Sequence, residues 1–368
     1  MRFIQIVGTK GKGSTSAYVA NILMAAGYKT GLFISPHIQR ETERITINGQ
    51  EIPRDKLDWL LSLTTETGYF RKFYQAAMGW FYDQRVQVAV METGMGGRRD
   101  PATRLPISQL IYTPVGMDHT DVLGDTIQKI CMEKAAAIRN KVNVVMAPQD
   151  KRAAGIIRAT CFVRRSSLSE VKHEDYCVAE DGSFSAYGIE GLRIQNPGSM
   201  QYVNAAVAVR AAKELARRGF RISEQHIREG LANTVLTGRQ QYVPQADALV
   251  DGAHNVDSLK FLHDTLQTYY ADRRKVLICA SMKDKDVSYF AQMADQFDKV
   301  YASQMDYERS MTAQEMAKNF PAGTDITLCT GTEDAYAKAK GYAAEQGAMI
   351  VFAGSIYQAG EALDLFER

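Results

Sequence analysis

A short stretch near the N-terminus combines glycines, hydroxyl side chains and lysines in an order that suits phosphate binding. Its sequence is Val7-Gly8-Thr9-Lys10-Gly11-Lys12-Gly13-Ser14-Thr15, and it lies between an apolar run and a segment with helical periodicity. Backbone N–H groups of such a turn and the positive end of the helix dipole face an anion. Lys12 adds a positive charge, and Ser14 or Thr15 can reach Mg²⁺. The stretch predicts a nucleotide triphosphate site.

The match to the phosphate-loop pattern GxxxxGK[ST] is incomplete, because Gly13 separates Lys12 from Ser14. The alternative is a glycine-rich turn that only joins a strand to a helix. Lys10 and Lys12 would then be ordinary solvated lysines.

Polar residues with metal-binding potential follow three other apolar runs. These are Ser35-Pro36-His37, Glu92 at the head of Glu92-Thr93-Gly94, and Asp118-His119-Thr120. Taken singly, a glutamate or histidine after a strand is more often structural or solvated. Together with Ser14, the side chains of Glu92 and His119 form a plausible Mg²⁺ set, although imidazole is an uncommon ligand for this ion.

The elements that must position these residues alternate between short β-rich runs and amphipathic helical stretches. Strands are expected at 3–7, 29–34, 86–91, 109–113 and 142–146, and helices at 16–26, 70–84 and 126–140. This alternation predicts an α/β fold with a P-loop-type, mostly parallel sheet and helices on both faces. Ligands of such sheets bind beyond the carboxyl ends of the strands, where the polar residues above would converge.

The second half of the chain predicts a small antiparallel addition and then a second, Rossmann-like α/β domain. Short antiparallel strands are expected at 161–165, 177–180, 184–187 and 192–195, and strands of the second domain at 248–250, 276–279, 299–302, 326–329 and 349–352. We expect an N-terminal ATP-binding domain over residues 1–237, a linker over 238–242 and a C-terminal domain over 243–368.

Composition limits the possible function classes. The 368 residues include 44 Lys and Arg against 42 Asp and Glu, which gives a net charge of +2 and no indication of a nucleic-acid surface. No apolar run approaches the roughly 20 residues that span a bilayer. The five cysteines form no CxxC pair and suggest reduced thiols of a cytoplasmic protein. We expect a monomer that binds small molecules.

The motifs, taken in order, resemble the folylpolyglutamate synthase and dihydrofolate synthase branch of the Mur ligase family. The resemblance spans most of the chain, and the matching motifs are Gly8 to Thr15, Ser35-Pro36-His37, Glu43-Arg44-Ile45-Thr46-Ile47-Asn48-Gly49, Glu92-Thr93-Gly94-Met95-Gly96-Gly97-Arg98-Arg99-Asp100, Asp118-His119-Thr120, Glu133-Lys134-Ala135, Gly238-Arg239, Asp251-Gly252-Ala253-His254-Asn255, Lys283-Asp284-Lys285-Asp286 and Gly354-Ser355-Ile356-Tyr357.

This resemblance implies an ATP-dependent amide-bond ligase. In the family, ATP phosphorylates a carboxylate of a folate or pteroate acceptor, and the amine of L-glutamate attacks the acyl phosphate. By the same resemblance, Lys12 binds the β- and γ-phosphates, Ser14 and Glu92 ligate one Mg²⁺, and His119 ligates a second. Lys134 matches a family lysine that is often carbamylated; the alternative is a surface lysine in a helix over 127–138.

Further site residues also rest on the resemblance. Asn204, expected to open a helix over 205–217, matches an asparagine near the adenine, although a helix N-cap is an equal alternative. Arg239 matches an arginine that reaches the ATP phosphates, so we expect it to respond to domain closure. Asp251 would contact the nucleotide, and His254 with Asn255 would line the glutamate pocket; a simple Asp-Gly turn is the alternative there.

Departures from the family pattern concern the acceptor. Relatives carry a helix and loop before the phosphate loop, so either this sequence is truncated or the acceptor is held differently. Arg71 stands where the family usually has a glutamate, which reverses a charge in the crevice expected to include Ser35 and His37. Lys10 replaces a usual asparagine, and Asp100-Pro101-Ala102-Thr103 replaces Asp-Ala-Thr-Asn.

Three hypotheses follow. The first is a glutamate ligase acting on folates or pteroates. The second is a ligase of the same fold with another carboxylate acceptor, favoured by Arg71 and the missing N-terminal segment. The third is a nucleotide-binding homologue without catalysis, which the presence of Lys12, Glu92, His119 and Lys134 argues against.

Overall fold

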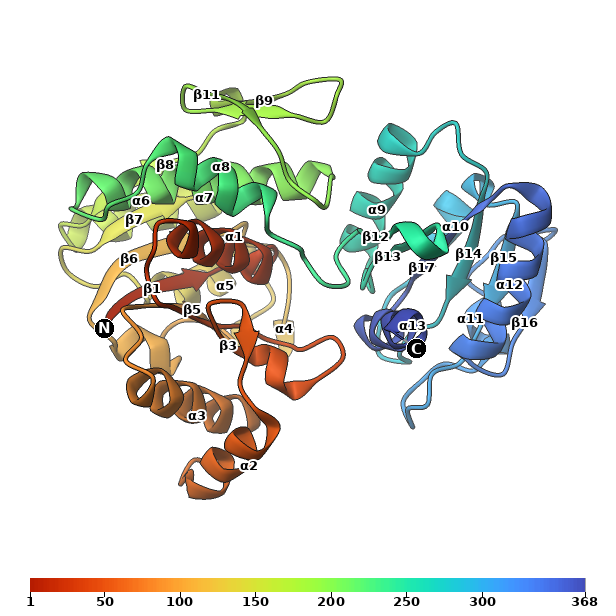
Figure 1. Cartoon of the computed structure of the whole chain (residues 1–368), viewed down its shortest axis with the longest axis horizontal. Helices are drawn as coiled ribbons and strands as arrows, with labels where there is room; N and C mark the ends of the chain where they lie inside the picture. Colours follow the sequence, from red (N-terminus) through yellow and green to blue (C-terminus); the bar gives the residue numbers. More distant parts are fainter. Residues whose placement is uncertain (368) are drawn as a thin grey trace. The chain divides into compact units, whose positions relative to one another are not determined.

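The computed structural model describes residues 1–367, which divide into two compact units. The first unit comprises Met1–Gln195 and Met200–Thr234, and the second comprises Asn196–Ser199 and Val235–Arg368. Figure 1 colours both units along the sequence. No helix among residues 1–367 is long and apolar enough to cross a membrane.

The first unit is built on an eight-stranded sheet whose central strands are parallel. In spatial order its strands are β4 (Gln50–Glu51), β3 (Ile45–Ile47), β2 (Thr30–Phe33), β5 (Val88–Glu92), β1 (Arg2–Val7), β6 (Ile107–Tyr112), β7 (Asn143–Met146) and β8 (Ser167–Glu170). The antiparallel pairs are β2 with β3 and β3 with β4. The five strands expected in this region are confirmed to within two residues at either end, because each is an apolar run with a turn or polar residue at its ends.

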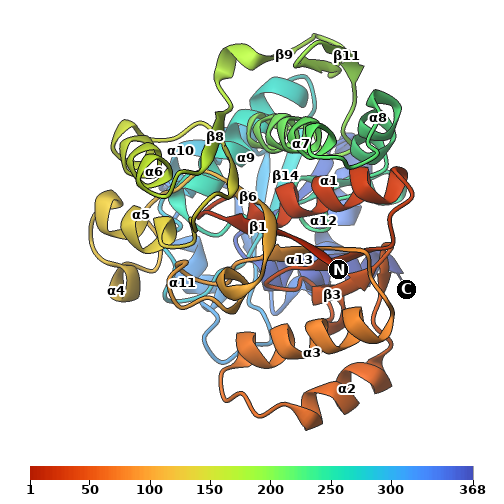
Figure 2. The same ribbon diagram turned by 90° about the vertical axis from the view of Figure 1, so that its left-hand side faces the viewer.

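Helices cover both faces of this sheet, as Figure 2 shows. They are α1 (Lys12–Ala25), α2 (Arg54–Leu63), α3 (Tyr69–Asp83), α4 (Thr120–Leu123), α5 (Ile127–Ala135), α6 (Lys151–Val163), α7 (Ser199–Arg217) and α8 (Glu224–Ala232). Two residues of β1 on the same face of the sheet join different helices, because they are four positions apart. Phe3 joins the core under α2 and α3, and Val7 joins the core under α5 and α6. The α/β class with a mostly parallel sheet is therefore confirmed.

A small antiparallel sheet of β9 (Tyr176–Val178), β10 (Phe184–Ala186) and β11 (Ile189–Leu192) decorates this unit, as expected. The strand expected at 161–165 is wrong, because Cys161 lies in the last turn of α6. Asp150 caps that helix by accepting a hydrogen bond from the Arg152 amide, and the buried side chains of α6 follow a helical period. The strand expected at 192–195 overlaps β11 only at Leu192.

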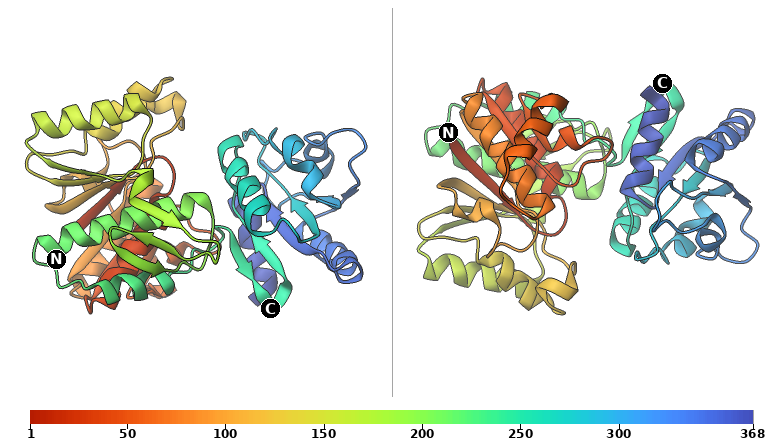
Figure 3. Two further views of the ribbon diagram at one scale, coloured as in Figure 1. Left: turned by 90° about the horizontal axis from the view of Figure 1, so that it is seen from above. Right: turned by 90° about the horizontal axis from the view of Figure 1, so that it is seen from below.

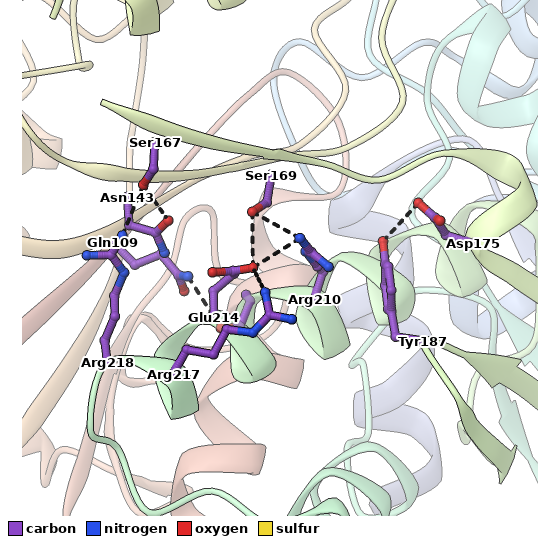
Figure 4. A network of polar contacts seen from close by, with 11 residues as sticks. Gln109, Asn143, Ser167, Ser169, Asp175, Tyr187, Arg210, Glu214, Arg217 and Arg218 are labelled. Atoms are coloured by element: carbon purple, nitrogen blue, oxygen red, sulfur yellow. Dashed lines mark hydrogen bonds and ion pairs between the residues drawn. The ribbon is translucent and has the colours of Figure 1, made fainter. Parts of the chain in front are cut away.

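Polar side chains form a layer between the sheet and α7, as Figure 4 shows. Glu214, 8% exposed, accepts hydrogen bonds from Ser169 of β8 at 3.1 Å and from Arg217 at 2.7 Å, and pairs with Arg210 at 3.0 Å. Ser167 donates to Asn143 on the neighbouring strand at 3.0 Å. This layer ties the edge strand β8 to the helix that also lies over the phosphate loop.

The second unit has a six-stranded sheet in the order β12 (Gln241–Val243), β13 (Ala248–Val250), β17 (Met349–Ala353), β14 (Lys275–Cys279), β15 (Lys299–Ala302) and β16 (Ile326–Leu328). All pairs are parallel except β12 with β13. The helices are α9 (Val256–Tyr269), α10 (Phe290–Met293), α11 (Ala313–Ala317), α12 (Thr332–Gln346) and α13 (Ile356–Glu367). Figure 3 gives two further views of these elements. The five expected strands are confirmed.

Candidate functional site

The predicted phosphate loop is a tight turn between β1 and α1. Gly11 is the N-cap of α1 with a left-handed φ of 76°, and a Cβ at this position would overlap the Asn204 side chain. A Cβ at Gly8 would overlap the hydroxyl of Thr113 and lie 2.8 Å from its carbonyl oxygen. Only glycine fits at these two positions, because the backbone passes close to Thr113 and to Asn204. The first N–H groups of α1 have no partner within the helix and suit an anion.

Lys12 places its ammonium group over this loop. Its Nζ lies 3.3 Å from the carbonyl oxygen of Thr9, to which it donates, and 3.8 Å from Oε1 of Glu92. The Lys12 side chain is 16% exposed, so it is neither an ordinary solvated lysine nor fully buried. A cation at the mouth of a turn of backbone amides attracts a phosphate group.

Glu92 ends β5 and lies beside the first turn of α1. Its carboxylate is 2% exposed, its Oε2 accepts a hydrogen bond from the Ser35 amide at 3.1 Å, and a Cβ on Gly13 would lie 3.5 Å from that oxygen. Ser14, 8% exposed, lies on the same first turn. A carboxylate and a hydroxyl beside a phosphate loop suit Mg²⁺, which is typically held by one or two carboxylates, substrate phosphates and water.

His119 lies at the tip of β6 in a left-handed conformation, with φ 50°, and is the N-cap of α4. Its Nε2 lies 3.7 Å from Oδ2 of Asp118, and both side chains are 47% exposed. Over residues 1–367 no three His, Cys, Asp or Glu side chains converge in a way that could hold a metal ion. The geometry therefore brings Glu92 to Lys12 and Gly13, whereas His119 contacts Asp118 in its own loop.

Lys134 is buried rather than a surface lysine, which excludes that alternative. It is 3% exposed, and its Nζ donates to the carbonyl oxygen of Gly8 at 2.8 Å. Tyr112 donates to the Lys134 carbonyl at 2.7 Å and fixes this turn of α5. Burial, and then the charge of Lys12, lower the pKa of Lys134 to about 8. The neutral amine of Lys134 is therefore more accessible than that of an exposed lysine.

Asp100 ends a motif that the sequence analysis matched to the family, but it was given no role there. It is 4% exposed, and its carboxylate accepts hydrogen bonds from the Gly94 and Ala102 amides, both at 2.9 Å. Burial raises its pKa to about 6, although those hydrogen bonds and the charges of Arg71 and Lys12 oppose the shift. The signal that could have found it is an acidic residue in the glycine-rich turn after β5.

Asn204 does not open a helix, which corrects the expectation from sequence. Helix α7 already begins at Ser199, because a chain of small and apolar residues continues the helical pattern toward the N-terminus. Asn204 is 1% exposed; its Oδ1 accepts from the Thr15 hydroxyl at 3.4 Å, and its Nδ2 donates to Gln201 at 3.1 Å. The N-cap alternative is therefore wrong, and Asn204 lies against the phosphate loop. Gln201 was missed.

Arg71 lies in the first turn of α3 and remains half-exposed. Its guanidinium donates to the carbonyl oxygen of Arg99 at 3.1 Å and lies 3.7 Å from Glu66. The charge of Arg71 therefore lies over the loop that contains Asp100.

The second unit carries its own group of predicted residues at the carboxyl end of β13. Asp251 is 8% exposed and accepts hydrogen bonds from the amides of Gln240 at 2.9 Å and Ala253 at 2.6 Å. Burial raises the pKa of Asp251 to about 6, and the charge of Arg239 opposes this. A Cβ on Gly252 would lie 3.0 Å from Nη1 of Arg239, so the guanidinium packs on this turn.

His254 and Asn255 have local structural partners. His254 Nδ1 lies 2.7 Å from the Gly252 carbonyl oxygen, and the His254 amide donates to Ser258 at 3.0 Å. Asn255 is the N-cap of α9, accepting from the Ser258 amide at 2.9 Å. A simple Asp-Gly turn does not describe this segment, because Asp251 is buried and bonded across it.

Comparison with known proteins identifies the family. The glutamate ligase domain of Mur ligases matches residues 238–356. Folylpolyglutamate synthase of Lacticaseibacillus casei is 30% identical, covering 82% of this chain and 75% of that protein. Dihydrofolate synthase/folylpolyglutamate synthase of Bacillus subtilis is 28% identical, and the match covers 97% of this chain and 88% of that protein. The structure of E. coli FolC in complex with DHPP and ADP is 26% identical, covers 100% of this chain and 88% of its own, and has a TM-score of 0.86. The chain belongs to the folylpolyglutamate synthase family of the Mur ligase superfamily.

Proposed function

We propose that this protein is an ATP-dependent ligase that adds L-glutamate to a carboxylate of a folate or pteroate through an acyl phosphate. The observation that carries the proposal is the phosphate loop with Lys12 over it and the buried carboxylate of Glu92 3.8 Å from that lysine. The γ-phosphoryl group passes to an acceptor carboxylate oxygen and ADP leaves. The glutamate amine then attacks the acyl carbon, loses a proton, and phosphate leaves.

The residues divide by role. Gly8, Thr9, Gly11, Gly13 and Thr15 form the loop, and Lys12 binds the phosphates. Ser14, Glu92 and His119 would hold Mg²⁺, which would neutralise phosphate charge during transfer; two ions are expected. Asn204, Arg239 and Asp251 contact the nucleotide, Ser35, His37 and Arg71 contact the acceptor, and His254 with Asn255 contacts glutamate.

Carbamylation of Lys134 is part of the proposal. A neutral amine adds CO₂ and loses one proton to become a carbamate, and a pKa of about 8 makes the neutral amine available. The resulting carboxylate would lie beside Gly8, to whose carbonyl Lys134 donates at 2.8 Å. We expect a ¹³C carbamate signal after incubation with labelled bicarbonate. The Lys134→Arg variant should lack it, and a wild-type protein without the signal contradicts the assignment.

The test of the overall function is ADP release with ATP, Mg²⁺ and L-glutamate over a panel of acceptors. Turnover with dihydropteroate or reduced folates supports the proposal. No turnover with any acceptor would leave a nucleotide-binding homologue without catalysis, and contradict the proposal.

Arg71 favours the second candidate, a ligase with another carboxylate acceptor. Its guanidinium lies on the Arg99 carbonyl beside the site, where the family usually has a glutamate. Turnover only with carboxylic acids other than pterins would support that reading. A monomeric state and a cytoplasmic location stay predictions, and sedimentation velocity would test the first.

A further inference from the structure

The motif Glu43-Arg44-Ile45 has no role in the function proposed above, yet it builds the loop that contains His37. Glu43 accepts hydrogen bonds from three successive amides, those of Ile38 at 2.8 Å, Gln39 at 2.8 Å and Arg40 at 2.6 Å. One carboxylate therefore fixes the backbone turn that follows His37.

Arg44 acts on the His37 ring itself. It is 6% exposed, and its Nε donates to Nδ1 of His37 at 2.9 Å. The guanidinium lies over the rings of Tyr69 at 5.0 Å and Phe73 at 5.1 Å, and the Arg44 carbonyl accepts from the Ile34 amide at 3.0 Å. Aromatic rings below and a backbone hydrogen bond beside it hold Arg44 in one orientation.

This contact determines where the His37 proton lies. An arginine Nε–H can only donate, so the Nδ1 atom that it meets must be an unprotonated acceptor. The ring proton is then on Nε2, and the imidazole is neutral. Burial, followed by the charge of Arg44, lowers the pKa of His37, while Glu43 and Glu41 oppose the shift. Over residues 1–367 no hydrogen bond engages Nε2, so this N–H is available to a ligand.

The loop that carries this donor begins at the phosphate site. Ser35, two residues before His37, donates its amide to Oε2 of Glu92 at 3.1 Å, and Oε1 of Glu92 lies 3.8 Å from Lys12. An acceptor carboxylate must lie near the γ-phosphate to be phosphorylated. A neutral N–H donor can orient such a carboxylate without adding a third cation beside Lys12 and a metal site.

We propose that Arg44 is a positioning residue, which holds His37 as a neutral imidazole whose Nε2–H donates to a carboxylate oxygen of the acceptor. The inference rests on the ligase function proposed above. It predicts that Arg44 acts on acceptor binding only through His37.

Two substitutions of His37 distinguish the roles of its two ring nitrogens. Gln places a donor near the position of Nε2, whereas Asn reaches only the position of Nδ1. We expect His37→Asn to raise KM for the acceptor about ten- to a hundredfold, the loss typical of a hydrogen bond to a charged group, and His37→Gln to raise it less. Arg44→Met, which keeps the aliphatic stem over Tyr69 and Phe73, should raise KM about fivefold or more with little change in kcat.

The decisive test is the double variant. If Arg44 acts through His37, Arg44→Met should have little further effect on KM in the His37→Gln background. An equal effect of Arg44→Met in both backgrounds overturns the proposal, because Arg44 would then act on the fold alone. Tyr69→Phe is the control, since it removes the hydrogen bond to Glu41 but keeps the ring below Arg44.

Nitrogen NMR of the unliganded protein separates this proposal from the function on which it rests. Two-bond ¹H–¹⁵N spectra should show His37 protonated at Nε2 and unprotonated at Nδ1, and the Nδ1 signal should move in Arg44→Met. A protonated Nδ1 overturns the proposal whatever the enzyme does. If no acceptor is turned over, the ligase function fails, and with it the assignment of Nε2–H to an acceptor.

Discussion

At the scale of single residues, the site depends on charged groups held at low exposure. Lys12, Glu92, Asp100 and Lys134 all lie in the first unit, and each except Lys12 is less than 5% exposed. Burying a charge costs free energy unless the charge is paired or hydrogen-bonded. In a site that binds phosphates and a metal ion, the bound ligand supplies the opposite charge.

Lys12→Met should lower kcat/KM for ATP by about a hundredfold or more, because it removes a cation from the transferring phosphoryl group. ADP release at saturating acceptor measures the effect, and the unfolding midpoint should hardly change. Lys172→Met is the matched control, since that lysine is 63% exposed and pairs with Glu174 at the surface. An unchanged rate in Lys12→Met would refute the phosphate assignment.

Asp100 should make stability depend on pH in the acid range. Its folded-state pKa of about 6 lies above the unfolded value, so its contribution to stability is complete below about pH 4 and is lost as the pH rises through about 6. Relative to wild type, Asp100→Asn should lack this decrease, which amounts to at most about 3 kcal/mol. Urea unfolding at pH 4 to 7 measures it, with the exposed Asp55→Asn as control. If the free energy of unfolding changes with pH in the same way in wild type and in Asp100→Asn, the raised pKa of Asp100 is contradicted.

At the scale of elements, the strand–turn–helix unit of β1 and α1 demands glycine. Gly11 and Gly49 provide a matched pair, with φ 76° and φ 77°. A Cβ at Gly49 meets nothing within 4 Å, whereas a Cβ at Gly11 overlaps Asn204. The pair separates the cost of a left-handed backbone from the cost of crowding the loop.

Gly11→Ala and Gly49→Ala should each lose about 1–2 kcal/mol for the left-handed conformation. Gly11→Ala should lose more than this and should also bind ADP more weakly, because Asn204 must move away from the loop. Calorimetric titration with ADP and urea unfolding measure the two effects. Equal ADP affinity in both variants would show that the loop does not hold the nucleotide.

Helix α7 is held to β8 by the polar layer of Figure 4, and Glu214 is its centre. Glu214→Ala should destabilise the first unit by about 2 kcal/mol, because Arg210, with a side chain 24% exposed, loses its carboxylate partner. The exposed Glu180→Ala is the control. Urea unfolding that does not distinguish the two variants would show that the layer contributes nothing to stability.

At the scale of the whole molecule, the second unit carries its own group of predicted site residues around Arg239 and Asp251. In the second unit, Arg239 packs on Gly252 and its charge opposes the rise in the pKa of Asp251. Removing that charge should raise the pKa of Asp251 above about 6 and make the carboxylate protonate nearer neutral pH.

Arg239→Ala should therefore lower kcat by about tenfold or more, with a greater loss at pH 6 than at pH 8, and should affect the unfolding midpoint less than it affects turnover. Arg239→Lys should keep part of the activity because it keeps the charge. The control is Arg274→Ala, a surface arginine that pairs with Asp298. A wild-type kcat in Arg239→Ala would remove this residue from the site.

The sequence by itself determined the phosphate loop, the order of motifs and the parallel strands other than β8. Apolar runs with turn or polar residues at their ends predict β1, β5 or β14, and the glycines around Lys12 predict the turn, because these signals are local in the chain. A local signal also misled: Cys161 lies in a β-rich run, but the helical period of α6 and its cap at Asp150 decide its conformation.

Only the tertiary structure decided which residues are buried and which atoms they meet. Lys134 is buried against Gly8, Asp100 is bonded across its own turn, Asn204 lies inside α7 beside Gly11, and Arg44 meets Nδ1 of His37. Two of these contacts, Lys134 with Gly8 and Asn204 with Gly11, join segments far apart in the sequence, so no periodicity or spacing encodes them. The other two lie within single loops whose conformation the local sequence pattern does not specify. Burial and neighbouring charge set protonation and hydrogen-bonding roles, and both arise only when the sheet brings its strand ends together.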